Sequence, residues 1–357
     1  MNALRDWFRR HLSNPQVVAL AVVVVVLVVV IWAFGHMLAP LLAALVIAYL
    51  LDSLASRLRQ RGVPHLAAVL AVFLGFVALL LVAVLWLFPL LARQLSQLFQ
   101  QAPSMLAKAQ QALLQLPTQY PALVSEEQVR DLLSGLSSEV VTLGQAILSL
   151  SFSSVVTMIT IGVYLVLVPI LVFFLLKDKA MISSWGQTFL PRDRQLTDQV
   201  WGEVDKQLGN YVRGKFVEIL IVGLAMWIVF RLLGLQYAVL LATITGLSVL
   251  IPYVGATVVT IPVALVAYFQ FGLEAGFYYA LLGYGIIQFL DGNLLVPLLF
   301  SEVVDLHPVA IITAILFFGG IWGFWGVFFA IPLATAIQAI LRAWPASHPA
   351  QAAAPPS

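Results

Sequence analysis

Residues 22–31 read VVVVVLVVVI, ten apolar side chains in succession inside a longer apolar run from Val17 to Phe34. The whole chain has the same character, because 62% of its 357 residues are hydrophobic and only 10% are charged. Soluble proteins average about 25% charged residues. The composition excludes a disordered chain and disfavours a soluble enzyme, and it predicts an all-α, polytopic helical membrane protein.

Several motifs that carry enzyme chemistry are absent from the sequence. The chain has no cysteine, which excludes disulfides and cysteine-based metal sites. It has no Gly-x-x-x-x-Gly-Lys-Ser/Thr motif for ATP phosphates, and its five histidines are too scattered for a zinc site. We therefore expect no enzyme, no cofactor and no metal. A net charge of +2 gives no indication of nucleic-acid binding.

About eight hydrophobic segments follow one another along the chain, interrupted by two longer polar stretches. A membrane-crossing helix needs about 20 apolar residues. Gly35 and His36 separate the first two apolar runs, so we expect two helices linked there. The predicted organisation is three transmembrane helices in 1–92, an extracytoplasmic amphipathic helical segment in 93–150, a fourth transmembrane helix in 151–176, a cytoplasmic amphipathic segment in 177–215, a C-terminal transmembrane bundle with broken helices in 216–342 and a disordered tail in 343–357.

The distribution of basic residues predicts the orientation of these segments. Suppose that the N-terminus is cytoplasmic. The N-terminal tail, the loop after the second apolar run and segment 177–215 then hold 13 of the 18 Lys and Arg residues. Basic residues concentrate in the cytoplasmic loops of membrane proteins. We expect a cytoplasmic N-terminus, and an even number of spans returns the C-terminus to the same side.

The two polar stretches have amphipathic helical patterns. In 93–150, apolar residues recur at spacings of three and four after a capping box that starts at Ser125, which predicts a helical hairpin outside the membrane. Its apolar stripe either packs on the ends of the spans or contacts another subunit. In 177–215, tryptophans flanked by basic residues favour anchoring at the membrane surface, with a role in gating as the alternative.

The C-terminal third contains a predicted helix break at residues 243–256. Pro252 and Gly255 interrupt two apolar stretches of about half a span each, and Thr245 and Ser248 lie just before them. Transporters use unwound backbone of this kind to coordinate substrates and ions. The alternative is a loop that only reaches the interface, and the sequence fits re-entrant and fully crossing forms of 237–270 equally well.

A second group of polar residues follows in the next apolar run. Gln288 and Asp291 lie three positions apart on one helical face, and Asn293 and Pro297 follow. An ionisable group inside a span is costly and is a functional candidate by default. Asp291 is therefore our first candidate for the pathway of a substrate or ion. Further on, three glycines at spacings of three and four favour close helix packing over a ligand role: Gly319, Gly323 and Gly326.

Four motifs of the chain resemble those of the autoinducer-2 exporter (AI-2E) family, and most of all its PerM-type permeases. The motifs are the 173–178 stretch with Gly214-Lys215, the break at 252–255, the Gln288 to Pro297 segment, and the Gly323 to Pro332 segment. The resemblance covers nearly the whole chain. It implies a multi-pass transporter of the bacterial inner membrane, and family members are associated with export of autoinducer-2 or with Na⁺(Li⁺)/H⁺ antiport.

Our leading hypothesis is a secondary transporter of a small polar solute similar to autoinducer-2. Its pathway would combine the 243–256 break with the 288–297 segment. The alternatives are a Na⁺(Li⁺)/H⁺ antiporter and a non-transporting oligomeric membrane scaffold built by segment 93–150. The partners implied are the lipid bilayer, a small-molecule or ion substrate and further copies in a homo-oligomer, with no nucleic acid. The sequence leaves substrate identity, direction, coupling ion and stoichiometry open.

Overall fold

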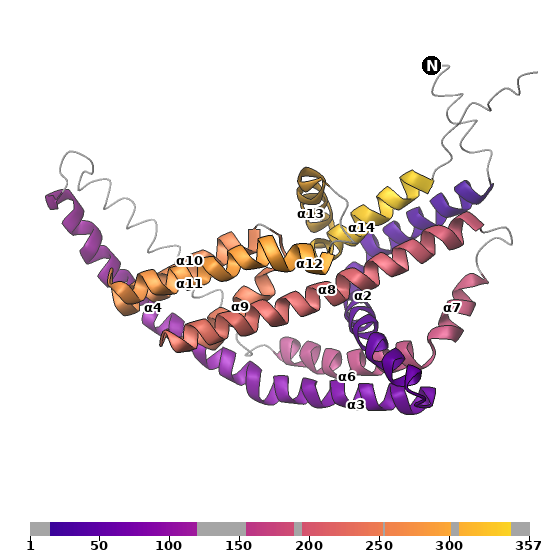
Figure 1. Ribbon diagram of the computed structural model, residues 1–357, viewed down its shortest axis with the longest axis horizontal. Coiled ribbons are helices and arrows are strands. Elements are labelled where there is room, and N and C mark those ends of the chain that lie inside the picture. Colours follow the sequence, from indigo (N-terminus) through magenta and orange to yellow (C-terminus); the bar gives the residue numbers. More distant parts are fainter. Residues whose placement is uncertain (1–14, 120–154, 189–194, 253, 301–306, 344–357) are drawn as a thin grey trace, which may run out of the picture. The chain divides into compact units, whose positions relative to one another are not determined.

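The computed structural model describes residues 15–119, 155–188, 195–252, 254–300 and 307–343 (Figure 1). Within these ranges all regular structure is helical and no strand occurs. Five helical segments are long and apolar enough to cross a membrane, and three shorter helices are also apolar. The five are Met37–Gln60, His65–Met105, Ile159–Lys177, Val254–Phe271 and Ala275–Phe300. The predicted polytopic helical membrane protein is confirmed.

The chain folds into two compact units. The first comprises residues 1–72, 170–217 and 294–357, and the second comprises residues 73–169 and 218–293. Within the first unit lie α2 (Pro15–Gln60), α7 (Lys179–Gln187), α12 (Val296–Phe300), α13 (Pro308–Trp322) and α14 (Phe324–Ala343). Within the second lie η1 (Ala83–Leu87), α4 (Phe88–Gln119), α9 (Ala238–Ser248), α10 (Val254–Phe271) and α11 (Ala275–Leu290). The elements α3 (His65–Val82), α6 (Val155–Lys177), α8 (Gln195–Leu232) and η2 (Asp291–Leu295) each run from one unit into the other.

Helix α2 differs from the two helices expected around Gly35 and His36. It continues for 46 residues through this point and through Pro40. A single glycine inside a helix costs only about 1 kcal/mol, so it does not break one flanked by long apolar runs. The helix ends near Gly62, whose φ of +87° is the left-handed conformation that glycine adopts freely. The expected link at Gly35 was therefore wrong, whereas the turn after Arg61 is present.

Helix α3 also continues into the polar stretch that follows it. It passes through η1, a π-helical turn, into α4, so one helical path runs from His65 to Gln119. The first arm of the predicted extracytoplasmic hairpin is thus a direct extension of the preceding span. The second arm, with the capping box at Ser125, and the tail from residue 344 lie outside the described residues.

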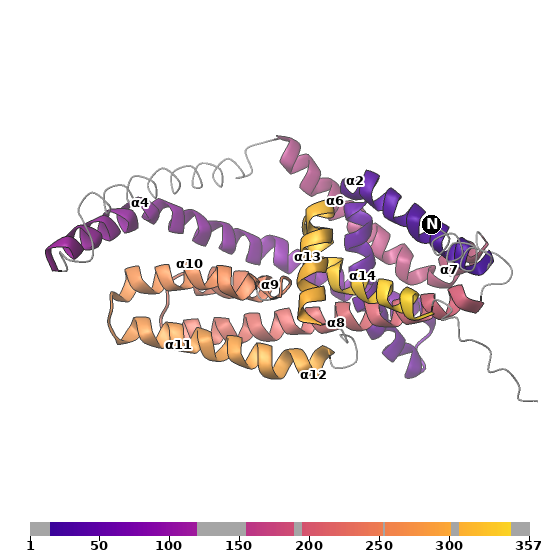
Figure 2. The same cartoon turned by 90° about the horizontal axis from the view of Figure 1, so that it is seen from above.

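In the first unit, α13 and α14 follow each other through a tight turn and are in close contact, and Figure 2 shows them at a steep angle to each other. Gly323 makes the turn with a φ of +58°. A Cβ on Gly326 would lie 1.9 Å from the carbonyl oxygen of Phe318, and one on Gly319 would lie 2.8 Å from the side chain of Val327. Small residues at these positions let the two backbones approach closely.

Candidate functional site

The predicted helix break is present between α9 and α10. Helix α9 ends at Ser248, and α10 begins at Val254. Gly255 is buried, and a Cβ at this position would lie 1.8 Å from the carbonyl oxygen of Ser248. The first turn of α10 therefore rests directly on the last turn of α9, and only a glycine fits at position 255.

Thr245 and Ser248 lie in the last turn of α9, just before this break. The Thr245 hydroxyl donates to the Leu241 carbonyl at 2.7 Å, and the Ser248 hydroxyl donates to the Thr245 carbonyl at 2.7 Å. Both hydrogens are thus used within α9. Each oxygen keeps lone pairs, but Thr245 is fully buried, whereas the half-buried Ser248 can accept a hydrogen bond from a solute.

Helix α11 packs against α10, and together with Asp291, the first residue of η2, it presents three polar side chains on one face: Tyr284, Gln288 and Asp291. Their spacing of four and then three residues places them one above another on a helix. We call this set the α11 polar face. The Tyr284 hydroxyl donates to the Ala256 carbonyl at 2.6 Å, and the Gln288 side chain lies near the same hydroxyl. Tyr284 therefore ties the polar face to the first turn of α10, beside the break.

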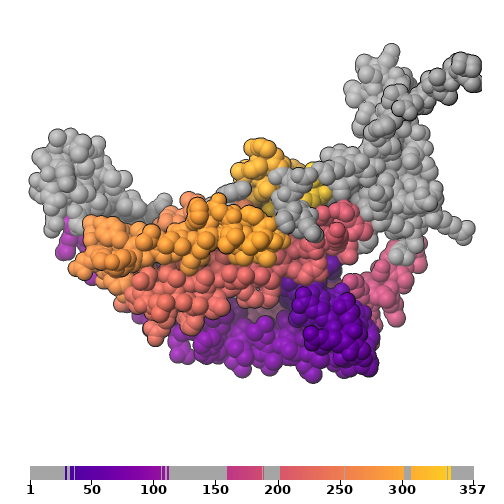
Figure 3. Space-filling view, viewed as in Figure 1, coloured from indigo at the N-terminus to yellow at the C-terminus, as the bar shows by residue number. Residues whose placement is uncertain are grey.

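The outer surface of α11 is apolar. Large side chains are exposed along it, as expected for a helix in contact with lipid. Figure 3 shows α11, in orange, at the surface of the protein. They are Tyr278, Tyr279, Leu282, Ile286 and Phe289. Gln288 and Asp291, in contrast, are half-buried. The polar face is therefore covered by protein to a greater extent than the outer surface of α11.

Asp291 begins η2, where the helix widens into a π turn. Pro297 has no N–H to donate to the carbonyl four residues earlier, which accounts for the widening. Single π turns inside α-helices are frequent at functional sites. Asn293 is exposed, and its amide donates to the Phe289 carbonyl at 2.9 Å. The structure thus groups Gln288 and Asp291, while Asn293 bonds to its own helix and Pro297 is exposed in the other unit.

Two further ionisable residues on α8 were not among our candidates. Glu218 is 1% exposed and Lys215 is 4% exposed. In the second unit, a Cβ on Gly246 of α9 would lie 2.9 Å from the Ile219 carbonyl, so α8 and α9 are in close contact beside Glu218. In the first unit, the Lys215 ammonium lies 5.1 Å from the centre of the Phe300 ring. In the sequence, Glu218 could have been found as one of the few charged residues after residue 215, and Lys215 is part of one of the four motifs given above.

The first unit also contains an ionic cluster centred on Asp52 of α2. Its carboxylate lies 2.8 Å from the Lys179 ammonium of α7 and 3.5 Å from the Arg59 guanidinium. One turn earlier on α2, the Tyr49 hydroxyl donates to Asp205 of α8. The start of segment 177–215 is therefore fastened to α2. Among the described residues, no group of three or more His, Asp or Glu could hold a metal ion.

Comparisons with known proteins agree with this architecture. A family model described as "AI-2E family transporter" matches residues 20–346. The chain is 47% identical to the Escherichia coli K12 protein named "Putative permease PerM", over 98% of this chain and 99% of that protein. It is 26% identical to the Bacillus subtilis protein named "Putative transport protein YueF", over 84% of this chain and 82% of that protein. A multi-pass, all-helical membrane protein that matches the family model over most of its length is a member of it: the chain belongs to the AI-2E transporter family.

Proposed function

We propose that this protein is a secondary transporter that moves a small polar solute, similar to autoinducer-2, across the bacterial inner membrane with both termini cytoplasmic. The observation that carries the proposal is the helix break between α9 and α10 beside the α11 polar face. Unwound backbone at membrane depth is tolerated where protein or a watery cavity covers it, and transporters bind their substrates at such breaks.

The groups near the break suit a hydroxyl-rich solute. Backbone carbonyls and the half-buried Ser248 oxygen would accept hydrogen bonds from hydroxyl groups, and the buried Thr245 would support the end of α9. The Gln288 amide both donates and accepts, and the Asp291 carboxylate accepts strongly. Pro252 and Gly255 would keep the backbone unwound and closely packed. In this proposal Asn293 and Pro297 shape η2 rather than touch the solute.

A gradient would supply the energy for transport, since the sequence contains no ATP-binding loop of the Walker type. Asp291 is the candidate proton carrier, because a half-buried carboxylate in a span changes its proton affinity with its surroundings. A Na⁺(Li⁺)/H⁺ antiporter would use the same residue with a cation in place of the solute.

Purified protein in liposomes tests the proposal through a substrate panel. Autoinducer-2, Na⁺ and Li⁺ are offered with and without an imposed proton gradient. We expect autoinducer-2 flux well above that of protein-free liposomes and stimulated by the gradient. If only Na⁺ or Li⁺ drives proton movement, the antiporter hypothesis holds and the solute transporter hypothesis does not. The absence of flux for every compound would contradict both hypotheses.

A further inference from the structure

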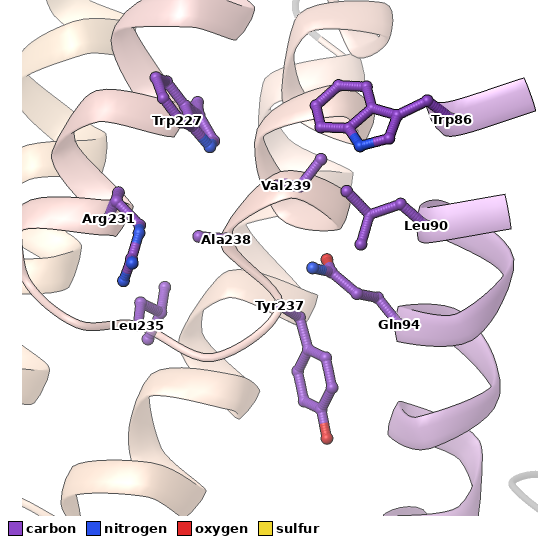
Figure 4. Close-up of a pocket in the computed structure, with 9 residues that line it drawn as sticks. All are labelled: Trp86, Leu90, Gln94, Trp227, Arg231, Leu235, Tyr237, Ala238 and Val239. Carbon is purple, nitrogen blue, oxygen red and sulfur yellow. The ribbon is translucent and has the colours of Figure 1, made fainter. Parts of the chain in front are cut away.

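A pocket of about 570 Å³ lies within the second unit, between α8, the loop before α9, and the helical path of η1 and α4 (Figure 4). Its volume is in the range of pockets that bind small ligands. Two indoles, Trp86 and Trp227, flank one end, and Arg231 and Gln94 lie on opposite walls. Its other lining residues are Leu90, Leu235, Tyr237, Ala238 and Val239.

The loop that forms the base of this pocket is held in place by two glutamines. Gln270 of α10 accepts from the Gln236 N–H at 2.7 Å and donates to the Gly234 carbonyl at 2.8 Å. Gln94 of α4 accepts from the Leu240 N–H at 2.8 Å. Tyr237 has a φ of +57°, a conformation that a non-glycine residue keeps only where its surroundings hold it. The pocket is therefore preformed.

Arg231 is the one charged residue in the lining. No described carboxylate forms an ion pair with it, and the Gln94 carbonyl oxygen is already used by Leu240. A guanidinium beside aromatic walls favours an anion, and its planar fork matches a phosphate in particular.

The pocket lies beside the end of an apolar span, where a span of this length would meet the membrane surface. Gln270 is in the last turn of α10, an 18-residue span, and the turn that follows contains the charged Glu274. Tryptophan and tyrosine concentrate at this level of a bilayer. Trp86 is 65% exposed and Trp227 is 40% exposed, and the neighbouring Leu85 and Leu232 are exposed as well. One side of the pocket therefore presents apolar surface to lipid.

We propose that this pocket binds the headgroup of an anionic phospholipid. Arg231 faces the phosphate, and the two indoles contact the glycerol and the first acyl carbons. The exposed leucines continue the apolar surface along which the acyl chains lie. This site is separate from the α11 polar face, and its occupant is a component of the membrane rather than the transported solute.

Lipid binding to the purified, delipidated full-length protein tests the site. The probes are phosphatidylglycerol and phosphatidylcholine, with affinities measured by native mass spectrometry. One basic residue near a membrane surface contributes about a fivefold preference for an anionic lipid. We expect at least this preference in the wild type and its loss in Arg231→Gln. Arg231→Lys keeps the charge and should keep most of the preference.

Arg93→Gln is the matched control, because Arg93 lies on α4 beside Gln94 but does not line the pocket. It should bind phosphatidylglycerol as the wild type does. If Arg231→Gln fails to fold, Ala238→Met fills the pocket while keeping the charge, and it should also abolish the preference. Unchanged binding in the folded Arg231→Gln or Ala238→Met protein would overturn the proposal. If inorganic phosphate competes for the site as strongly as phosphatidylglycerol does, the site binds a free anion, and the proposal of a lipid site is overturned.

Discussion

At the scale of single residues, Gly255 and Gly292 are two glycines with opposite surroundings. A Cβ at position 255 would overlap the Ser248 carbonyl, whereas nothing lies within 4 Å of one at position 292. Gly255→Ala should therefore destabilise the protein by several kcal/mol, as overpacking against backbone does. Gly292→Ala should change the stability by less than about 1 kcal/mol. Thermal unfolding in detergent measures both, and equal melting temperatures would refute the close contact of α10 with α9.

The residues around the helix break illustrate how much of the site the sequence predicts. Pro252 and Gly255 are visible as helix breakers, so the break was predicted. The contact of position 255 with the Ser248 carbonyl depends on how the chain turns between α9 and α10, and the bond from Tyr284 to Ala256 joins two different helices. Neither can be read from a local sequence pattern. Gln288 and Asp291 were found by their spacing, and extending that spacing back by four residues would have added Tyr284.

At the scale of elements, a deletion that starts within α4 distinguishes the transporter hypothesis from the scaffold hypothesis. The whole of α4 belongs to the second unit, and its first turns are joined to α9 because Gln94 accepts from the Leu240 N–H. Beyond them the helix extends to Gln119. Deleting residues 101–150 should leave autoinducer-2 flux within about twofold of the wild type if the protein is a transporter. It should dissociate any oligomer if this segment builds an assembly.

Flux and light scattering on the truncated protein provide the two measurements for this deletion. Loss of flux with an intact oligomer would contradict the role that we give to the α9–α10 break. The deletion starts at residue 101 because a deletion from residue 93 would also remove Gln94 and disturb α9. The sequence predicted a helical segment from residue 93 but not its continuity with the preceding span, because the change from apolar to polar residues was interpreted as the end of that span.

At the scale of the whole molecule, the orientation that the basic residues predict can be tested directly. The chain has no cysteine, so a single introduced cysteine is the only site in the protein that a maleimide can label. A membrane-impermeant maleimide should label Ser104→Cys in intact cells, and Gly202→Cys and Asn2→Cys only after lysis. The Asn2→Cys variant is the most informative of the three, because α2 is one continuous helix and not the two linked helices that the sequence predicted. If it is labelled in intact cells together with Ser104→Cys, then α2 crosses the membrane once and the N-terminus is not cytoplasmic.

The central claim is that solute passes the α9–α10 break under the control of Asp291. Uptake of autoinducer-2 into proteoliposomes under a proton gradient tests it most directly. Asp291→Asn should lower the initial rate at least tenfold while the protein elutes as the wild type does. Glu274→Gln, which removes an exposed carboxylate at the start of the same helix, should transport normally. A wild-type rate in folded Asp291→Asn would contradict the account.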